Sequence, residues 1–187
     1  MEKEIWKDIP GYEGLYMVSN LGNVKSLPRE MWNGKGYFMS KEKLLSKNTC
    51  PIGYNRVILT NYEKKRYYVG VHYLVLKAFV GEKPEGYTVC HNDNNKDNNK
   101  LNNLRYDSLR ENSIDMYRHG YKVTIGKLTV EDVVEIRRLY ATGKYLQKDL
   151  ANIYNVSQSN ISRAIKSERF NWINDDGTIN KSKTQMK

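Results

Sequence analysis

The chain of 187 residues carries 31 Lys and Arg against 21 Asp and Glu, a formal net charge of +10 that favours a polyanionic partner. No apolar run approaches the ~20 residues that a membrane span requires, and residues 1–4 lack the apolar core of a signal peptide. These features argue against a membrane protein and indicate a cytoplasmic one with room for one or two small domains.

The first third of the sequence has the pattern of short strands and turns. Glycines interrupt short apolar runs such as 15–18, and residues 54–60 alternate apolar with polar side chains, as a half-buried strand does. Residues 67–71 are expected to pair with that strand as a hairpin across 61–65. We therefore predict a small antiparallel β platform, with a β-rich DNA-binding module over residues 1–67.

A helix and then a strand are predicted after the platform. Apolar residues recur at helical spacing over residues 72–79, and the helix is expected to end before Gly81. Residues 87–90 have the composition of a strand, which would deliver His91 at its end. His72 lies on the mostly apolar helix and is expected to be a packing residue.

A polar loop and a second helix follow. The run 92–103 contains too few apolar side chains to build a core and is predicted to be a loop, with simple low complexity as the alternative. Residues 108–117 have helix character, which places Asn112 on a helix. Strand, loop and helix thus carry His91 and Asn112 in that order, 21 positions apart (112 − 91).

His91 and Asn112 have the chemistry that hydrolysis of a phosphodiester requires. A base must deprotonate water, and a hard cation must hold the charge that builds on the scissile phosphate. A neutral imidazole with a pKa near ~6.5 is suited to take that proton, an effect usually worth ~10²–10⁴ in rate. His91 is therefore the candidate general base and the amide oxygen of Asn112 a candidate metal ligand; a structural His91 packed at the strand end is the alternative.

The segments around these residues resemble the HNH endonucleases of phages, in particular the intron-encoded or free-standing homing type. The matching segments are residues 71–75, 84–91, 98–99 and 103–105. A second match, over residues 6–16 and 18–26, resembles a module often placed before that core. The resemblance implies a ββα-metal nuclease core over residues 68–120, in a phage-encoded protein that acts in the cytoplasm of a bacterial host.

The resemblance also implies the reaction, the cofactor and the substrate. The reaction is hydrolysis of a phosphodiester in double-stranded DNA with a single divalent cation, for which Mg²⁺ is expected and Mn²⁺ or a softer ion is the alternative. One such site per chain attacks one strand, so a monomer is expected to nick. The rival interpretation is a sequence-specific DNA-binding regulator with an inactive HNH-like core.

By the same resemblance, Asn112 is a metal ligand and Asn103 is the middle letter of the pattern, whose role is to hold the loop between strand and helix. Arg105 either contacts the DNA phosphate or forms a salt bridge. Cys90 departs from the simplest pattern, in which an Asp or His beside the catalytic histidine supplies the second metal ligand. A thiolate suits Mg²⁺ poorly.

Several explanations of Cys90 remain open. The cation is held by Asn112, waters and the DNA phosphate with reduced affinity, or Asp93 or another acid reaches it, or the site prefers a softer metal that Cys90 ligates. The plainest alternative is that Cys90 only packs. The second cysteine, Cys50, forms no CxxC pair with it, so neither a disulfide framework nor a structural zinc cage is expected.

The character of the sequence changes after a predicted linker over residues 121–128. Thr129 and Asp132 resemble a capping box that begins a helix, which is expected to run until Gly143. Residues 174–187 have almost no apolar side chains and are expected to form a disordered tail.

Two further helices are predicted over residues 148–153 and 158–166, joined by a tight turn at 155–157. This is the spacing of a helix-turn-helix over residues 129–173, whose last helix enters the major groove, with a packing or dimerisation unit as the alternative. Its exposed face offers side chains that read base edges or hold a phosphate. They are Gln158, Ser159, Asn160, Arg163 and Lys166. The expected fold class is therefore α+β, with the platform and nuclease core followed by an all-α domain.

Overall fold

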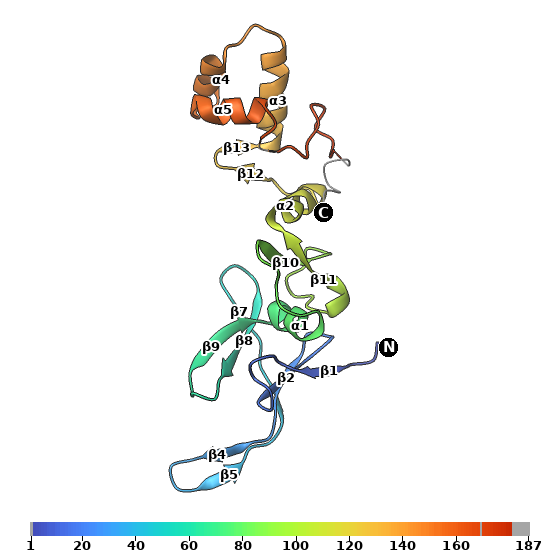
Figure 1. Ribbon diagram of the computed structural model, residues 1–187, viewed down its shortest axis with the longest axis vertical. Helices are drawn as coiled ribbons and strands as arrows, with labels where there is room; N and C mark the ends of the chain where they lie inside the picture. The colour runs from blue at the N-terminus through green and yellow to red at the C-terminus, as the bar shows by residue number, and fades with distance from the viewer. Residues whose placement is uncertain (1, 169, 181–187) are drawn as a thin grey trace. The chain divides into compact units, whose positions relative to one another are not determined.

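The computed structural model describes residues 2–168 and 170–180, and the chain divides into two compact units, Met1–Leu109 and Arg110–Lys187. Each unit is built around its own cluster of buried apolar side chains. Figure 1 shows that strands dominate the first unit and helices the second. No helix in the described part of the chain is long and apolar enough to cross a membrane.

The first sheet of the N-terminal unit is antiparallel and has the strand order β1-β2-β3-β6. Its strands are β1 (Trp6–Asp8), β2 (Tyr16–Ser19), β3 (Val24–Ser26) and β6 (Lys43–Leu44). The turn between β2 and β3 contains Gly22, whose φ of 79° favours glycine. A Cβ at Gly22 would lie 2.8 Å from the carbonyl oxygen of Asn99, so the turn lies directly against the loop that contains Asn99.

A second antiparallel sheet has the order β7-β8-β9 and contains the expected hairpin. Its strands are β7 (Asn48–Thr49), β8 (Asn55–Thr60) and β9 (Arg66–Gly70). In β8, Val57 and Leu59 are fully buried while Ile58 is exposed, which confirms the predicted half-buried strand. A separate hairpin projects away from both sheets (Figure 1); its strands are β4 (Glu30–Trp32) and β5 (Tyr37–Met39).

Helix α1 (Val71–Phe79) follows β9 directly and confirms the predicted helix. Its buried side chains Leu74 and Val75 belong to the same core as Val18 of the first sheet and Leu104. The module predicted over residues 1–67 and the first part of the nuclease core predicted over 68–120 therefore share one core. They are not separate domains, because burial worth ~1.5–3 kcal/mol per large apolar side chain joins them.

Strand β10 (Tyr87–His91) pairs in antiparallel fashion with β11 (Leu104–Ser108). The loop between them ends in a 3₁₀ turn, Leu101–Asn103. The N–H of Leu101 donates to the carbonyl oxygen of Asn20 at 2.8 Å. The predicted strand and polar loop thus lie where expected, and the loop is fastened to the first sheet.

The helices of the C-terminal unit surround one apolar core. They are α2 (Leu109–Arg118), α3 (Val130–Ala141), α4 (Gln147–Ile153) and α5 (Gln158–Ile165). Ile114 of α2 is fully buried in the same cluster as Ile136 and Leu150. The sequence predicts α2 as the end of a nuclease core over residues 68–120. In the structure, the buried side chain of α2 packs in the apolar core of the C-terminal unit instead.

Helix α3 begins at the predicted capping box. The backbone N–H of Thr129 donates to Oδ2 of Asp132 at 2.8 Å, and the backbone N–H of Asp132 donates to Oγ1 of Thr129 at 3.1 Å. These bonds satisfy donors that a helix start leaves unpaired. The α4–α5 turn also follows expectation, with Asn155 at a φ of 51° and Ser157 capping α5.

The prediction of a linker over residues 121–128 is wrong. This segment contains β12 (Thr124–Ile125) and ends at Leu128, the first residue of β13 (Leu128–Thr129). The two strands pair as a hairpin. Val123 and Leu128 are buried, with 8% and 6% of their surface exposed. Burial of these two apolar side chains in the C-terminal core orders the segment.

The prediction of a disordered tail over residues 174–187 is wrong for residues 174–180. Trp172 and Ile173 are buried, and Ile173 forms a β-bridge with Ile179. The N–H of Asn174 donates to the carbonyl oxygen of Thr178 at 2.8 Å. The rest of the predicted tail, residues 181–187, lies outside the described residues.

Candidate active site

The β10–β11 ribbon positions the candidate general base. His91 is the last residue of β10 and lies opposite Leu104, while Cys90 lies opposite Arg105. Successive side chains of a strand point to opposite faces, so Cys90 and His91 diverge. Cys90 is 3% exposed and His91 is half-buried.

Asn103 holds the loop between the two strands. Its Nδ2 donates to Oδ1 of Asp93 and to the carbonyl oxygen of Asn98, both at 2.8 Å, and its Oδ1 accepts the backbone N–H of Asp93 at 3.1 Å. Burial raises the pKa of Asp93, but hydrogen bonds from Asn98, the Asn95 N–H and Asn103 outweigh it and leave that pKa below its ordinary value. These contacts support the loop-holding role expected of Asn103.

One buried amide orients His91. The Nε2 atom of His91 lies 3.3 Å from Oδ1 of Asn99, which is 2% exposed. The Nδ2 of Asn99 donates to the carbonyl oxygens of Lys96 and Asp97, at 3.2 and 3.1 Å, so its Oδ1 faces the imidazole. Because an amide oxygen only accepts, Nε2 of the neutral ring carries the proton and Nδ1 keeps the lone pair.

Sequence reasoning did not single out Asn99 as a site residue. Its signal was present, since residues 98–99 belong to one of the segments that carry the family resemblance. What distinguishes Asn99 from the other asparagines of the loop is burial against Gly22, which depends on contacts remote in sequence.

His72 packs against the candidate base, together with Tyr54. The ring centroids of His72 and His91 are 5.6 Å apart, those of Tyr54 and His72 are 4.9 Å apart, and those of Tyr54 and His91 are 6.0 Å apart. A Cβ at Gly70 would lie 2.7 Å from Cε1 of His72, so only glycine leaves room for this ring. The sequence predicted packing for His72 but not its proximity to His91.

Burial keeps both imidazoles neutral at neutral pH. Burial, with a smaller contribution from His91, lowers the pKa of His72 from 6.5 to about 4. Burial also lowers the pKa of His91; its bond to Asn99 and the charge of Asp93 act in the opposite direction, and Lys96 adds to the lowering. His91 is therefore in the state that accepts a proton.

A groove of about 680 Å³ opens beside His72. Tyr54, Arg56 and Lys83 contribute to its lining, which is thus aromatic and cationic. Among the described side chains, two buried nitrogen atoms lack a hydrogen-bond partner, Nε of Arg56 and Nδ1 of His72, and both residues line this groove. Since buried polar groups are normally paired, a polar, negatively charged ligand fits it.

Arg105 forms an ion pair on the ribbon. Its Nε donates to Oδ2 of Asp107 at 2.8 Å, and its Nη1 donates to Oδ1 of Asn92. Of the two roles expected for Arg105, the structure without DNA therefore shows the salt bridge.

Asn112 lies on α2, in the C-terminal unit, whereas His91 lies in the N-terminal unit. The described residues contain no group of three or more His, Cys, Asp and Glu side chains that could hold a metal ion. The oxygens of Asp93 already accept several hydrogen bonds within the loop.

The polar face predicted for the last helix is present on α5. Ile161 and Ala164 are buried in the core, 0% and 2% exposed. The predicted DNA-binding side chains are exposed or partly exposed on the remaining surface. They are Gln158, Ser159, Asn160 and Arg163 on α5, and Lys166 just after its end.

Comparisons with known proteins agree with this geometry. Residues 4–60 match the NUMOD4 motif and residues 69–114 match an HNH endonuclease domain. The DNA endonuclease I-HmuI of Bacillus phage SP01 is 40% identical over 101 residues, 54% of this chain and 51% of that protein. An uncharacterized HNH endonuclease of Acanthamoeba polyphaga mimivirus is 30% identical over 172 residues, 87% of this chain and 38% of that protein.

The fold also matches a solved structure, described as DNA binding and cleavage by the HNH homing endonuclease I-HmuI. The match has a TM-score of 0.52 at 28% identity and covers 90% of this chain and 92% of that one. The matched region contains the antiparallel ribbon β10–β11, with His91 at the end of β10, followed by α2. The chain belongs to the HNH homing endonuclease family. It spans about half the length of the first of these curated relatives and less of the second.

Proposed function

We propose that this protein is a DNA endonuclease that hydrolyses one phosphodiester of double-stranded DNA, with His91 as general base. The observation that carries the proposal is the contact of His91 Nε2 with the buried Asn99, 3.3 Å away, within a region that matches the HNH family. A monomer then nicks one strand, in the cytoplasm of a bacterial host. This agrees with the phage origin of the relative I-HmuI.

The proton follows a defined path on this imidazole. Nδ1 of His91 takes a proton from water, the resulting hydroxide forms a bond to phosphorus, and the bond from phosphorus to the leaving oxygen breaks. The leaving oxygen then takes a proton from solvent water. Asn99 and the charge of Asp93 both favour the imidazolium that forms. His72 stays neutral beside it and so adds no opposing positive charge.

We propose a single divalent cation, with Mg²⁺ as the expected ion and Mn²⁺ or a softer ion as alternatives. When bound, the cation supplies charge stabilisation at the scissile phosphate. Asn112 would be one protein ligand, and Cys90 a second if the ion is soft. The family match over residues 69–114 supports this assignment because it includes both residues.

Nicking of supercoiled plasmid DNA tests the proposed function. The purified chain with Mg²⁺ should convert supercoiled DNA to the open circle, and EDTA should stop the conversion. DNA binding without any cleavage, in Mg²⁺ and in Mn²⁺ alike, would instead identify a regulator with an inactive core.

Replacing Cys90 with aspartate is expected to lower the Mg²⁺ concentration for half-maximal nicking severalfold, because a carboxylate is a harder ligand than a thiolate. Cys90→Ser adds no charge and serves as the control in the same metal titration. Cys90 is 3% exposed. A titration unchanged in the aspartate variant, or shifted to higher Mg²⁺, would show that Cys90 only packs.

We further propose that α4 and α5 form a helix-turn-helix that lengthens the recognised DNA site. The support is the left-handed turn at Asn155, the cap at Ser157 and the polar outer face of α5. Such a helix places its exposed side chains at base edges in the major groove. A dimerisation unit is the alternative use of the same helices.

Replacing Arg163 with alanine is expected to cost ~1–3 kcal/mol at the preferred site and to relax base preference there, if its guanidinium contacts a guanine edge. The measurement is duplex affinity at the mapped cleavage site and at a scrambled duplex. Lys166→Ala is the matched control, since loss of a phosphate contact weakens all sequences alike. Equal losses on both duplexes for Arg163→Ala would rule out base reading.

A further inference from the structure

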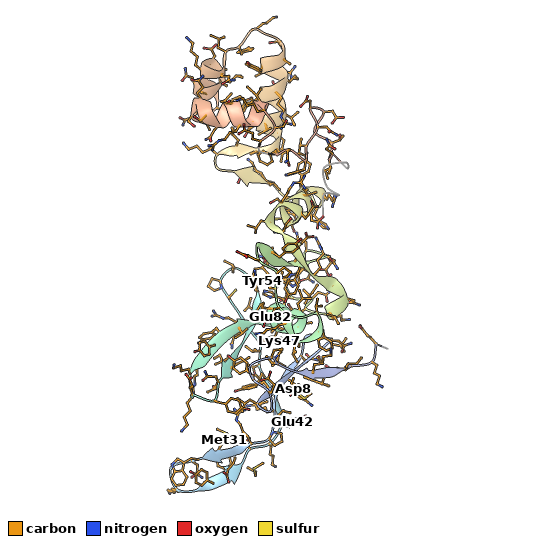
Figure 2. All side chains as sticks on the ribbon, in the orientation of Figure 1. Asp8, Met31, Glu42, Lys47, Tyr54 and Glu82 are labelled. Atoms are coloured by element: carbon orange, nitrogen blue, oxygen red, sulfur yellow. The ribbon has the colours of Figure 1, made fainter. Side chains whose placement is uncertain are left out.

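Large apolar side chains are exposed on the β4–β5 hairpin, which together with its flanking residues, 29–41, we call the aromatic hairpin. They are Met31, Trp32, Tyr37, Phe38 and Met39, with 41% to 72% of their surface exposed. Trp32 pairs with Tyr37 across the strands, and Met31 pairs with Phe38, so both faces of the hairpin are apolar. Figure 2 shows the projecting position of Met31. Clusters of exposed apolar side chains mark binding surfaces.

The aromatic hairpin is anchored at its base. The N–H of Ser40 donates to the carbonyl oxygen of Arg29 at 2.9 Å, and the N–H of Arg29 donates to Oγ of Ser40 at 3.0 Å. The Arg29 guanidinium donates to the carbonyl oxygen of Leu15 and to the hydroxyl of Tyr16, both at 3.2 Å. Tyr16 is 4% exposed, so this anchor reaches the core.

The tip of the aromatic hairpin is also ordered. Oδ1 of Asn33 accepts the backbone N–H groups of Lys35 and Gly36, both at 2.9 Å. The rings of Trp32 and Tyr37 contact each other, with centroids 5.0 Å apart. The hairpin is thus preformed, which reduces the entropy lost when it binds a partner.

Charge and size identify the partner. Residues 29–41 contain three cationic side chains, Arg29, Lys35 and Lys41, and one carboxylate, Glu30. The major groove of B-DNA, ~12 Å wide, admits a two-stranded ribbon and presents thymine methyl groups to apolar side chains. Lys35, in the turn between the strands, and Lys41, after β5, can neutralise phosphates.

The same surface continues onto the body of the unit. A groove of about 800 Å³ at the base of the hairpin is lined by Trp32 and Tyr37 together with Tyr62 and Lys64, which lie between β8 and β9. Aromatic and cationic side chains therefore extend beyond the hairpin itself, as a surface that follows a DNA backbone requires.

We propose that the aromatic hairpin enters the major groove of the duplex that the nuclease cuts, with Trp32 and Tyr37 against base edges and Lys35 and Lys41 near phosphates. The proposal rests on the proposed function and adds a DNA contact separate from the nuclease site and from α5.

Tryptophan fluorescence tests this contact directly. Trp32 is 57% exposed, whereas Trp172 is 3% exposed and Trp6 is partly buried, so acrylamide quenching reports mainly on the hairpin. Saturation of the full chain with a mixed-sequence duplex should reduce quenching severalfold, and Trp32→Phe should remove most of this change. Quenching unchanged by a duplex that binds would overturn the proposal.

A double variant gives an independent measurement. Trp32→Ala with Tyr37→Ala should weaken duplex binding about tenfold with only a small change in melting temperature, because both side chains are exposed and only their contact with each other is lost. Tyr121→Ala, at a position 51% exposed in the C-terminal unit, is the matched control and should bind as the wild type does. Methyl green, a major-groove ligand, should weaken duplex binding by the wild type more than binding by the double variant, which keeps only the major-groove contact proposed for α5.

The outcomes separate the two proposals. A wild-type chain that neither binds nor nicks duplex DNA removes the proposed function and the hairpin contact together. If the wild type nicks while the double variant binds DNA with unchanged affinity, only the hairpin proposal fails. Loss of self-association in the double variant, by analytical ultracentrifugation, with DNA binding intact, would assign the hairpin to a second copy of the chain.

Discussion

Replacing His91 with alanine is expected to abolish nicking of supercoiled DNA while duplex affinity stays almost unchanged. A positioned general base contributes ~10²–10⁴ in rate, and the structure gives His91 the neutral ring and the held Nε2 that this role needs. The measurements are the single-turnover nicking rate with excess Mg²⁺ and the dissociation constant by fluorescence anisotropy. His119→Ala, an exposed histidine at the end of α2, is the control.

The pH profile adds a second test of the same residue. Burial lowers the pKa of His91 below its ordinary value, so the imidazole takes up its proton at a lower pH than a free histidine does. The acidic limb of the wild-type pH profile should therefore have its midpoint below the ordinary pKa of histidine, about 6.5. Nicking by His91→Ala at the wild-type rate would remove His91 from the mechanism.

Deleting the chain from Lys127 onward is expected to abolish cleavage as well as site selection. In the structure, Ile114 of α2 is buried among side chains that the deletion removes, such as Ile136 and Leu150. A helix of 10 residues is only marginally stable without such packing, so the helix that carries Asn112 should unfold.

The experiment compares nicking and far-ultraviolet circular dichroism of the truncated and full chains. Asn112→Ala in the full chain measures the loss of the side chain alone, and Arg163→Ala measures the loss of base reading with the core intact. The truncated chain should lose at least as much activity as Asn112→Ala does. A truncated chain that nicks at the full rate would show that α2 folds without the C-terminal core.

Local patterns predicted most of the secondary structure. The alternation over residues 54–60 gave strand β8, the helical spacing over 72–79 gave α1, and the capping box at Thr129 gave the start of α3. These predictions succeeded because the period of apolar side chains and the pairing of helix-end donors depend on residues close in sequence.

The candidate site residues were singled out in part for the same reason. His91 and Asn103 lie in a short motif whose spacing identifies them, and the hydrogen bonds of Asn103 support its expected role. Asn99 and His72 were missed as neighbours of His91. Their contacts require the loop to lie against Gly22 and helix α1 to lie beside β10, and these arrangements join residues far apart in the chain.

The sequence by itself determined the family, the candidate base and the order of strand, loop and helix, since these are properties of residue type and spacing. Only the tertiary structure decided where the cores lie. The N-terminal module and the β10–β11 ribbon share one buried cluster. Helix α2 packs in the C-terminal core through Ile114. The physical reason is that burial depends on which apolar surfaces meet in space, and a helix read from its own residues does not reveal its partner.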